Sequence, residues 1–206
     1  MLNEKDSVEY WYDRAREAGA AAVGFGAKNL EKQNQQYEVK ESFVMKYVNS
    51  DITTMDYGCG IGRWAKHWAI NRYIGIDMTQ ALLDIAQSQN PSHFFIHIFK
   101  PYLEDGMGNE ILGEAIHQIF TSTVLQHCDD FLVKKIMESW KKWVPAVKTF
   151  ALYEINNGKT KPHVIGRPTF RYRQLLHASG FNVVSDSSAT HIVHGEAHTL
   201  SLIEVI

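Results

Sequence analysis

Short, nearly continuous apolar runs alternate along the chain with segments whose apolar residues recur at helical spacing. The apolar runs that suit buried strands are 52–57, 73–76, 94–99, 116–122, 149–155, 181–185 and 200–206. The segments with helical spacing are 7–19, 31–48, 79–89, 130–144 and 170–179. This α/β succession predicts one doubly wound, mostly parallel, seven-stranded sheet with helices on both faces and a strand pair at its end.

The same pattern predicts the surroundings of individual residues. The run 94–99 is apolar enough to be a central strand of a parallel sheet. Tyr47 and Phe131 fall on the apolar faces of their helices, so we expect both side chains to be buried. The His-rich stretch between 185 and 200 is predicted as a connection that joins the last two strands.

A length of 206 residues is that of one domain, which we expect to span 1–206. No apolar run reaches the ~18 residues that a membrane span needs, and the N-terminal residues are too polar for a secretory signal. We therefore expect a cytoplasmic protein without a membrane partner, and the oligomeric state stays open. Cys59 and Cys128 give neither a disulfide framework nor paired metal-ligand spacing, so no metal site is predicted.

The stretch 54–77 carries the strongest chemical signal. Its strand is followed by three alternate glycines, Gly58, Gly60 and Gly62, and then by 63–69, whose apolar residues lie at helical spacing. Glycines let backbone N–H groups approach a ligand, and the N-terminus of a helix adds unpaired donors. Asp77 ends the next strand, where doubly wound folds hold a pair of ribose hydroxyls. The stretch therefore predicts a cofactor that contains a nucleoside.

Two common nucleotide-binding loops do not match this stretch. The dinucleotide motif G-x-G-x-x-G requires a glycine at position 63, where this chain has Arg63. A Walker loop would end in Gly-Lys-Ser or Gly-Lys-Thr, and that ending is absent. Nicotinamide, flavin and Walker-type phosphate sites are therefore disfavoured.

The run Asp56-Tyr57-Gly58-Cys59-Gly60-Ile61-Gly62 resembles the acidic-x-Gly-x-Gly-x-Gly motif of class I S-adenosylmethionine-dependent methyltransferases. The run 121–127 is similar to the segment that follows the fourth strand of that family. The resemblance extends from about Ser7 to the last strand. It implies a Rossmann-like core over 51–206, an antiparallel last strand at 200–206, and a helical cap over the cofactor site at 1–50. It also implies S-adenosyl-L-methionine as cofactor and S-adenosyl-L-homocysteine as product.

The resemblance assigns a role to each matching residue. Gly58, Cys59 and Gly60 would approach the methionine part of the cofactor, with Asp56 fixing their loop. Asp77 would hold the ribose, Met78 would lie against the adenine, and Arg63 would pair with the carboxylate. The remaining cofactor-binding residues are expected to be Trp11, Tyr12 and Arg14 from the cap, and Thr121 and Ser122 beside the methionine amino group. The acidic residue that this family has after its third strand is missing or displaced to Glu104 or Asp105.

Methyl transfer from a sulfonium is an in-line displacement, so an enzyme contributes mainly by placing the nucleophile close and aligned. A hydroxyl or protonated amine acceptor would also need a base. His127 is the first candidate because its loop follows the fourth strand, and Glu154 at the end of the fifth strand is the second. A structural role as a hydrogen-bonding side chain is the alternative for His127.

The acceptor is predicted from charge. Ten basic and two acidic residues lie between Lys134 and Arg173, within a chain of net charge −2. In the loop after the fifth strand, we expect Lys161, His163 and Arg167 to pair with an anionic group of the substrate. A small anionic metabolite, methylated on oxygen or nitrogen, is the preferred acceptor. Methylation of an RNA or DNA base, and a non-catalytic subunit that only binds the cofactor, are the alternatives.

Overall fold

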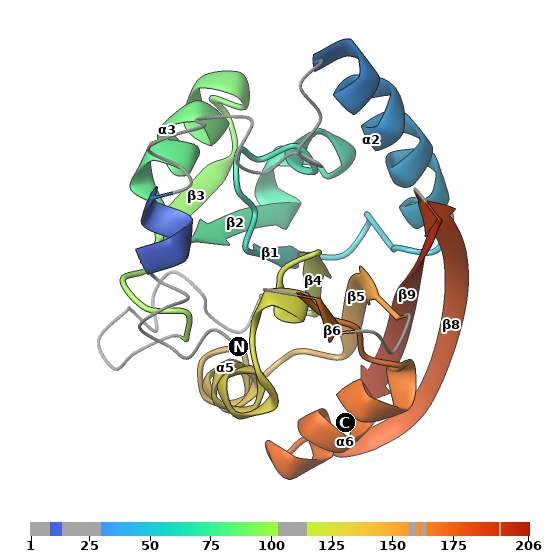
Figure 1. Ribbon diagram of the computed structural model, residues 1–206. Coiled ribbons are helices and arrows are strands. Elements are labelled where there is room, and N and C mark those ends of the chain that lie inside the picture. The colour runs from blue at the N-terminus through green and yellow to red at the C-terminus, as the bar shows by residue number, and fades with distance from the viewer. Residues whose placement is uncertain (1–8, 14–29, 103–114, 157–159, 162–163, 194) are drawn as a thin grey trace.

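A computed structural model describes residues 9–13, 30–102, 115–156, 160–161, 164–193 and 195–206. A seven-stranded sheet crosses the centre of this molecule, in the order β3-β2-β1-β4-β5-β9-β8 (Figure 1). Its strands are β1 Thr54–Tyr57, β2 Tyr73–Asp77, β3 Phe94–His97, β4 Gln118–Ser122, β5 Thr149–Ile155, β8 Val183–Val193 and β9 Glu196–Val205. Two short strands, β6 Thr160–Lys161 and β7 Val164–Ile165, form a separate antiparallel pair.

The strand directions agree with the predicted sheet. Neighbouring strands from β3 to β5 run parallel, whereas β9 is antiparallel to both β5 and β8. The predicted mostly parallel sheet with an antiparallel last strand is therefore confirmed. Because β1 pairs with β2 on one side and with β4 on the other, the strand order reverses at β1. The carboxyl ends of β1 and β4 are then the expected place for a ligand.

Helices cover both faces of the sheet, as predicted. Their bounds are α2 Leu30–Val44, α3 Gln80–Gln89, α5 Asp130–Trp143 and α6 Thr169–Ala178, and residues 9–13 are also helical. Successive strand residues point to opposite faces. In β4, Ile119 joins the core formed with α5 and α6, whereas Phe120 joins the core formed with the end of α2 and the segment after β1. Figure 1 shows α2 and α3 on one side of the sheet and α5 and α6 on the other.

The α-helix predicted over 63–69 is wrong. The structure has only a short 3₁₀ helix, η2 Ala65–His67, in which the N–H groups of Ala65 and Trp68 donate to the carbonyls three residues earlier. Trp64 and Trp68 are nevertheless buried, and both rings pack against Phe120. Burial of the two indoles against the sheet therefore produces the apolar spacing that had predicted a helix.

Three further expectations are corrected. The run 94–99 forms β3 at the edge of the sheet rather than at its centre, and Phe94 is 64% exposed. Phe131 and Tyr47 are exposed because neighbouring apolar residues of the same segments fill the core positions. The His-rich stretch is not a loop: β8 continues to Val193 and β9 begins at Glu196. β8 is an exposed edge strand with many polar residues, so the apolar pattern of the sequence predicted a shorter strand.

Candidate functional site

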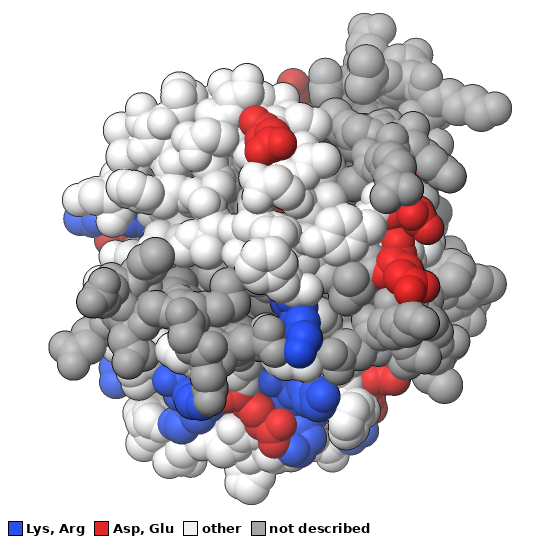
Figure 2. All heavy atoms as spheres, turned by 90° about the vertical axis from the view of Figure 1, so that its left-hand side faces the viewer, with Lys and Arg blue, Asp and Glu red and all other residues white. Residues whose placement is uncertain are grey.

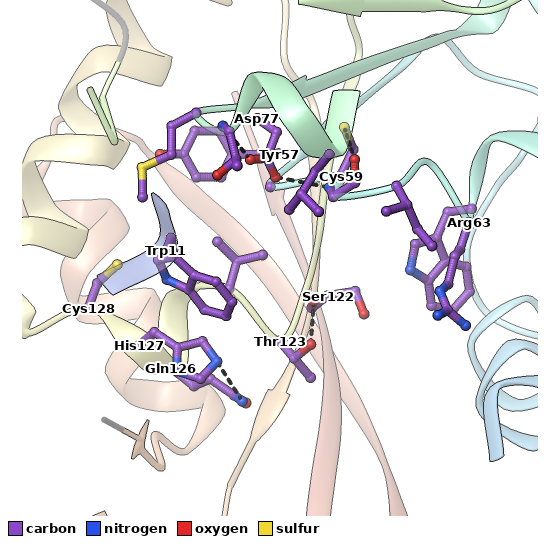
Figure 3. A pocket seen from close by; sticks show the side chains of 18 of the residues that line it. Trp11, Tyr57, Cys59, Arg63, Asp77, Ser122, Thr123, Gln126, His127 and Cys128 are labelled. Atoms are coloured by element: carbon purple, nitrogen blue, oxygen red, sulfur yellow. Dashed lines mark hydrogen bonds between the residues drawn. The ribbon is translucent and has the colours of Figure 1, made fainter. Parts of the chain in front are cut away.

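A cavity of about 290 Å³ opens at the carboxyl ends of β1, β2 and β4 (Figure 3). Its walls come from the loops after these strands, from α2, from the helical residues 9–13 and from the hairpin of β8 and β9. The cavity lies at the strand reversal where the sheet topology predicts a ligand. The glycine loop and Asp77 both line it.

The glycines of the loop after β1 are required by its conformation. Gly58, Gly60 and Gly62 have φ angles of +74°, +56° and +70°, in the left-handed region that glycine adopts readily. A Cβ atom on Gly58 would lie 2.5 Å from Cγ2 of Val124. The loop therefore packs so closely against the segment after β4 that a side chain at position 58 would push the two apart.

Asp77 fastens this loop from the next strand. Its Oδ2 accepts a hydrogen bond from the Gly60 N–H, and its Oδ1 accepts one from the Thr79 N–H, both at 2.9 Å. Burial raises the pKa of Asp77 above its ordinary value, and the two backbone hydrogen bonds oppose that rise. The carboxylate is thus held at the cavity wall in a fixed orientation.

Asp56 lies behind the loop and does not line the cavity. Its Oδ2 accepts a hydrogen bond of 2.6 Å from the Tyr73 hydroxyl, and its Oδ1 has no hydrogen-bond partner among the described residues. Burial raises the pKa of Asp56 to about 7. Asp56 acts on the site through β1 and β2 rather than by direct contact with a ligand.

Of the cofactor-binding residues expected in the N-terminal helix, one lines the cavity, one does not, and one lies outside the described residues. Trp11 lines the cavity, and its ring meets that of His127 edge-on, with 5.0 Å between the centroids. Tyr12 is not part of the lining, since its hydroxyl lies 3.4 Å from Nε2 of His97. Tyr10, which the sequence did not indicate, lines the cavity instead. Arg14 lies outside the described residues.

The segment after β4 supplies polar and aromatic groups to the cavity. Ser122, His127 and Gln126 line it, and Oγ of Ser122 is buried with no hydrogen-bond partner among the described residues. Thr123 also lines it and has a φ of +61°, which is uncommon for a residue other than glycine. Thr121 does not line the cavity, because its hydroxyl donates to Oε1 of Glu154 at 2.9 Å.

Glu154 holds the segment after β4 in place through hydrogen bonds. Besides the Thr121 hydroxyl, its carboxylate accepts hydrogen bonds of 3.1 to 3.2 Å from the N–H groups of Val124, Leu125 and Gln126. Burial raises the pKa of Glu154, and these four hydrogen bonds oppose the rise. Glu154 does not line the cavity, whereas His127 does. Of the two candidate bases, His127 alone is placed to reach a ligand.

Of the residues expected to bind an anionic substrate group, Arg167 does not line the cavity. Arg167 is 3% exposed, and its guanidinium donates to Oδ1 of Asp130 at 2.7 Å and to the carbonyls of Leu125 and Cys128. It therefore holds the segment after β4 rather than facing a ligand. Lys161 lies in β6, where no side chain is described, and His163 is outside the described residues.

Several side chains of the basic stretch 134–173 form ion pairs with acidic residues. Lys134 pairs with Glu138 one helical turn away, and Arg173 pairs with Asp186 of β8 at 2.8 Å. Figure 2 shows acidic and basic side chains interspersed on the face where α5 lies. Asp186 lies outside the basic stretch, so the fold partly neutralises its excess of positive charge.

Sequence reasoning missed two residues of α2 that line the cavity, Tyr37 and Lys40. Lys40 is 2% exposed, and burial lowers its pKa to about 7. The guanidinium carbon of Arg63 lies 3.8 Å from the centre of the Tyr37 ring. A signal was present, because Tyr37, Lys40 and Val44 share one helical face and Val44 is fully buried.

Other site types find little support in the described part of the chain. It contains no cluster of three or more His, Cys, Asp or Glu side chains that could hold a metal ion. Among the same residues, no helix is both long and apolar enough to cross a membrane. His198 and His191 stack on the rings of Tyr153 and Phe43.

No protein-family model and no curated protein matches the sequence. Solved structures do match the fold. A SAM-dependent methyltransferase from Anabaena variabilis is similar at a TM-score of 0.64 and 16% identity, over 100% of this chain and 96% of that one. Magnesium protoporphyrin IX methyltransferase from Synechocystis, solved with bound SAM, is similar at a TM-score of 0.63 and 15% identity, over 99% and 98%. A Leishmania major SAM-dependent methyltransferase is similar at 0.62 and 16%, over 96% and 82%. The chain therefore has the Rossmann-like methyltransferase fold.

Proposed function

We propose that this protein is a methyltransferase that uses S-adenosyl-L-methionine and acts on a small anionic metabolite. One observation carries the proposal: the glycine loop after β1 and the Asp77 carboxylate after β2 line the same cavity, at the strand reversal of a methyltransferase fold. The core would be 51–206, with the first 50 residues as a cap. One solved structure of the same fold is named as a SAM-dependent methyltransferase, and two structures of magnesium protoporphyrin IX methyltransferase contain SAH and SAM, which supports this choice of cofactor.

The donors and acceptors of the cavity suit the proposed cofactor. Each Asp77 oxygen takes one backbone hydrogen bond, and a carboxylate oxygen has capacity for a second, here a ribose hydroxyl. Met78, Ile98 and Pro101 offer an apolar surface for adenine. The buried Oγ of Ser122 lacks a partner among the described residues and suits the ammonium of the methionine part. The closeness of Gly58 to Val124 leaves room for a ligand only if position 58 has no side chain.

The bound cofactor would supply an electrophilic methyl group on a sulfonium. The chain's own contribution is placement, since an in-line displacement needs an aligned nucleophile and little covalent chemistry from the protein. His127 is placed to accept the proton of an acceptor hydroxyl or amine, and Trp11 lies against its ring. The hairpin of β8 and β9 contributes Glu196 and His198 to the same cavity, where the acceptor would enter.

Calorimetry with S-adenosylhomocysteine tests the cofactor. We expect the wild-type protein to bind it, and Asp77→Asn to weaken binding by about 10- to 100-fold, since a hydrogen bond to a charged group contributes about 1.5–3 kcal/mol. Asp84→Asn is the matched control because Asp84 lies nearby in α3, is exposed, and accepts a hydrogen bond from Gln80. Absence of binding by the wild type, or equal binding by both variants, would refute the proposed site.

The acceptor class has a separate test. With saturating S-adenosylmethionine, small carboxylic acids and phosphates should give turnover that changes little between 50 and 200 mM salt. A nucleic-acid acceptor would instead lose affinity by roughly 10³- to 10⁵-fold over that range if six to ten phosphates were contacted. Turnover on RNA or DNA with such a salt dependence, and none on small acids, would overturn the assignment to a metabolite.

A further inference from the structure

Two successive residues of β5 hold Gln126 by its backbone and by its side chain. The Gln126 N–H donates to Oε2 of Glu154 at 3.2 Å, and the Gln126 Oε1 accepts a hydrogen bond of 3.0 Å from the Ile155 N–H. Gln126 is 5% exposed, so bulk water competes little with these two hydrogen bonds. The amide of Gln126 is therefore fixed at the carboxyl end of β5, where it lines the cavity.

The hydrogen bond from Ile155 decides which atom of the Gln126 amide is the oxygen. A backbone N–H can only donate, so the atom that it meets must be the carbonyl oxygen of the side chain. The amide nitrogen then points the other way and lies 3.4 Å from Nε2 of His127. Figure 3 draws this hydrogen bond, with Trp11 next to the imidazole ring. Nε2 of His127 thus meets a group that donates hydrogen bonds and accepts none.

This contact determines which nitrogen of a neutral His127 carries the proton. One nitrogen of neutral imidazole donates and the other accepts, and the partner of one nitrogen sets the role of the other. Because the amide nitrogen of Gln126 only donates, Nε2 of His127 has to accept, and the proton is carried by Nδ1. The Trp11 ring packs edge-on against the imidazole, with 5.0 Å between the centroids, and restricts its rotation.

We propose that Gln126 is a positioning residue that keeps the proton of neutral His127 on Nδ1, so that Nε2 presents a lone pair to the substrate. A distance of 3.4 Å is long for a hydrogen bond, so a substrate hydroxyl or amine can replace the amide at Nε2 at little cost. The tautomer follows from the contacts of Gln126 alone, whereas its use in catalysis rests on the proposed function.

The proton transfer is then balanced as follows. The substrate oxygen or nitrogen attacks the methyl carbon with its electron pair, and the carbon–sulfur bond breaks with its pair remaining on sulfur. The O–H or N–H proton of the substrate moves to Nε2 of His127, and the ring becomes an imidazolium. A ring that already carried a proton on Nε2 could not take this step. The orientation of the Gln126 amide therefore decides whether His127 can act as the base.

Long-range ¹H–¹⁵N NMR spectra of protein with labelled histidine distinguish the two tautomers without any ligand. The His127 signals are identified by their loss in His127→Gln. At pH 8, the wild type should carry the His127 proton on Nδ1. Gln126→Glu places an acceptor beside Nε2, so the proton should move to Nε2, and Gln126→Met should give a mixture. A proton on Nε2 in the wild type, or the same tautomer in wild type and Gln126→Glu, would overturn the proposal.

Gln118→Glu is the matched control for the burial of a new carboxylate. Gln118 is also buried, in β4, but its Nε2 donates to Oγ1 of Thr54 at 3.0 Å instead of to a histidine. Gln118→Glu should lower stability in urea and leave the His127 proton on Nδ1. If it moved the proton as Gln126→Glu does, the effect would not come from the amide contact and the proposal would fall. Thermal unfolding of each variant checks that the fold is retained.

Turnover tests the catalytic consequence, with 4-hydroxybenzoate as probe substrate at saturating S-adenosylmethionine. Gln126→Glu should lower kcat by about 10²-fold or more, which is the contribution of a general base, and should change the KM for S-adenosylmethionine little. Gln118→Glu should keep its kcat. Equal kcat in wild type and Gln126→Glu would overturn the role in catalysis. If the wild type does not methylate the probe, the proposed function fails for this substrate, and the NMR spectra still decide the tautomer.

Discussion

Replacement of Arg167 by methionine should destabilise the protein rather than impair recognition of an anion. The side chain is 3% exposed, and three of its nitrogens donate to Asp130, Leu125 and Cys128. Arg167→Met would leave the buried Cys128 carbonyl without this donor, whereas the Leu125 carbonyl keeps the hydrogen bond from the Cys128 N–H. Asp130 would suffer less, because it is half-exposed and keeps a hydrogen bond from Arg171.

The size of the effect follows from these contacts. An unsatisfied buried acceptor costs about 1–3 kcal/mol, so Arg167→Met should lower the free energy of unfolding by roughly that amount. For a chain of this length, each 1 kcal/mol shifts Tm by about 2–4 °C, so Arg167→Met should lower Tm by roughly 2–12 °C. Arg171→Met is the matched control, since it removes an exposed partner of the same carboxylate and should cost at most about 1 kcal/mol.

Urea unfolding of the wild type, Arg167→Met, Arg167→Lys and Arg171→Met measures these differences. Arg167→Lys should recover little stability, because an ammonium cannot reproduce the planar fork that reaches three acceptors. Equal stability of Arg167→Met and Arg171→Met would refute the reasoning. A large rise in the Michaelis constant for an anionic acceptor, with stability unchanged, would restore the role in substrate binding that the sequence suggested.

Three further predictions concern the loop, the buried acid and the buried base. Gly58→Ala should destabilise the protein more than Gly195→Ala does and should abolish S-adenosylhomocysteine binding. Both glycines have positive φ, but only a side chain at position 58 would collide with Val124. Thermal unfolding measures the stability, and calorimetry measures the binding. Glu154→Gln replaces an acceptor oxygen with a donor amide, so it should lower the free energy of unfolding, measured in urea, by roughly 2–4 kcal/mol. Lys40 is protonated more readily in the unfolded chain, so wild-type stability should rise from pH 7 toward pH 10 by up to about 1.4 kcal/mol per unit, and Lys40→Met should lack this rise.

The sheet could be predicted from the sequence because its strands are buried. A buried strand needs a continuous apolar run, and 149–155 was bounded correctly on that signal alone. Strands at the edges of the sheet gave weaker signals. The long β8 carries polar residues on an exposed edge, and β3 is apolar although Phe94 faces solvent. An apolar run therefore marks a strand, but it does not by itself tell whether that strand lies at the centre or at the edge of the sheet.

The glycine loop and Asp77 at the cavity were predictable for a different reason. Gly58, Gly60 and Gly62 occupy conformations that other residues rarely adopt, and Asp77 ends its strand, so backbone geometry alone marks both in the sequence. Residues that act through packing leave no such mark. The role of Glu154 depends on four donors that the chain brings to it from 121–126, which no local pattern reveals.

The location of positive charge illustrates the same difference. A basic stretch in the sequence says nothing about the acids that folding will place beside it, and here Asp130 and Asp186, both outside the stretch, pair with Arg171 and Arg173. A charged residue within an apolar helical stripe is more informative, because its burial is already implied by its neighbours. Lys40 shares the face of Tyr37 and Val44, so its side chain is buried, and it lies at the cavity wall. An isolated charge on a buried helical face therefore marked the cavity, which the dense charges on exposed faces did not.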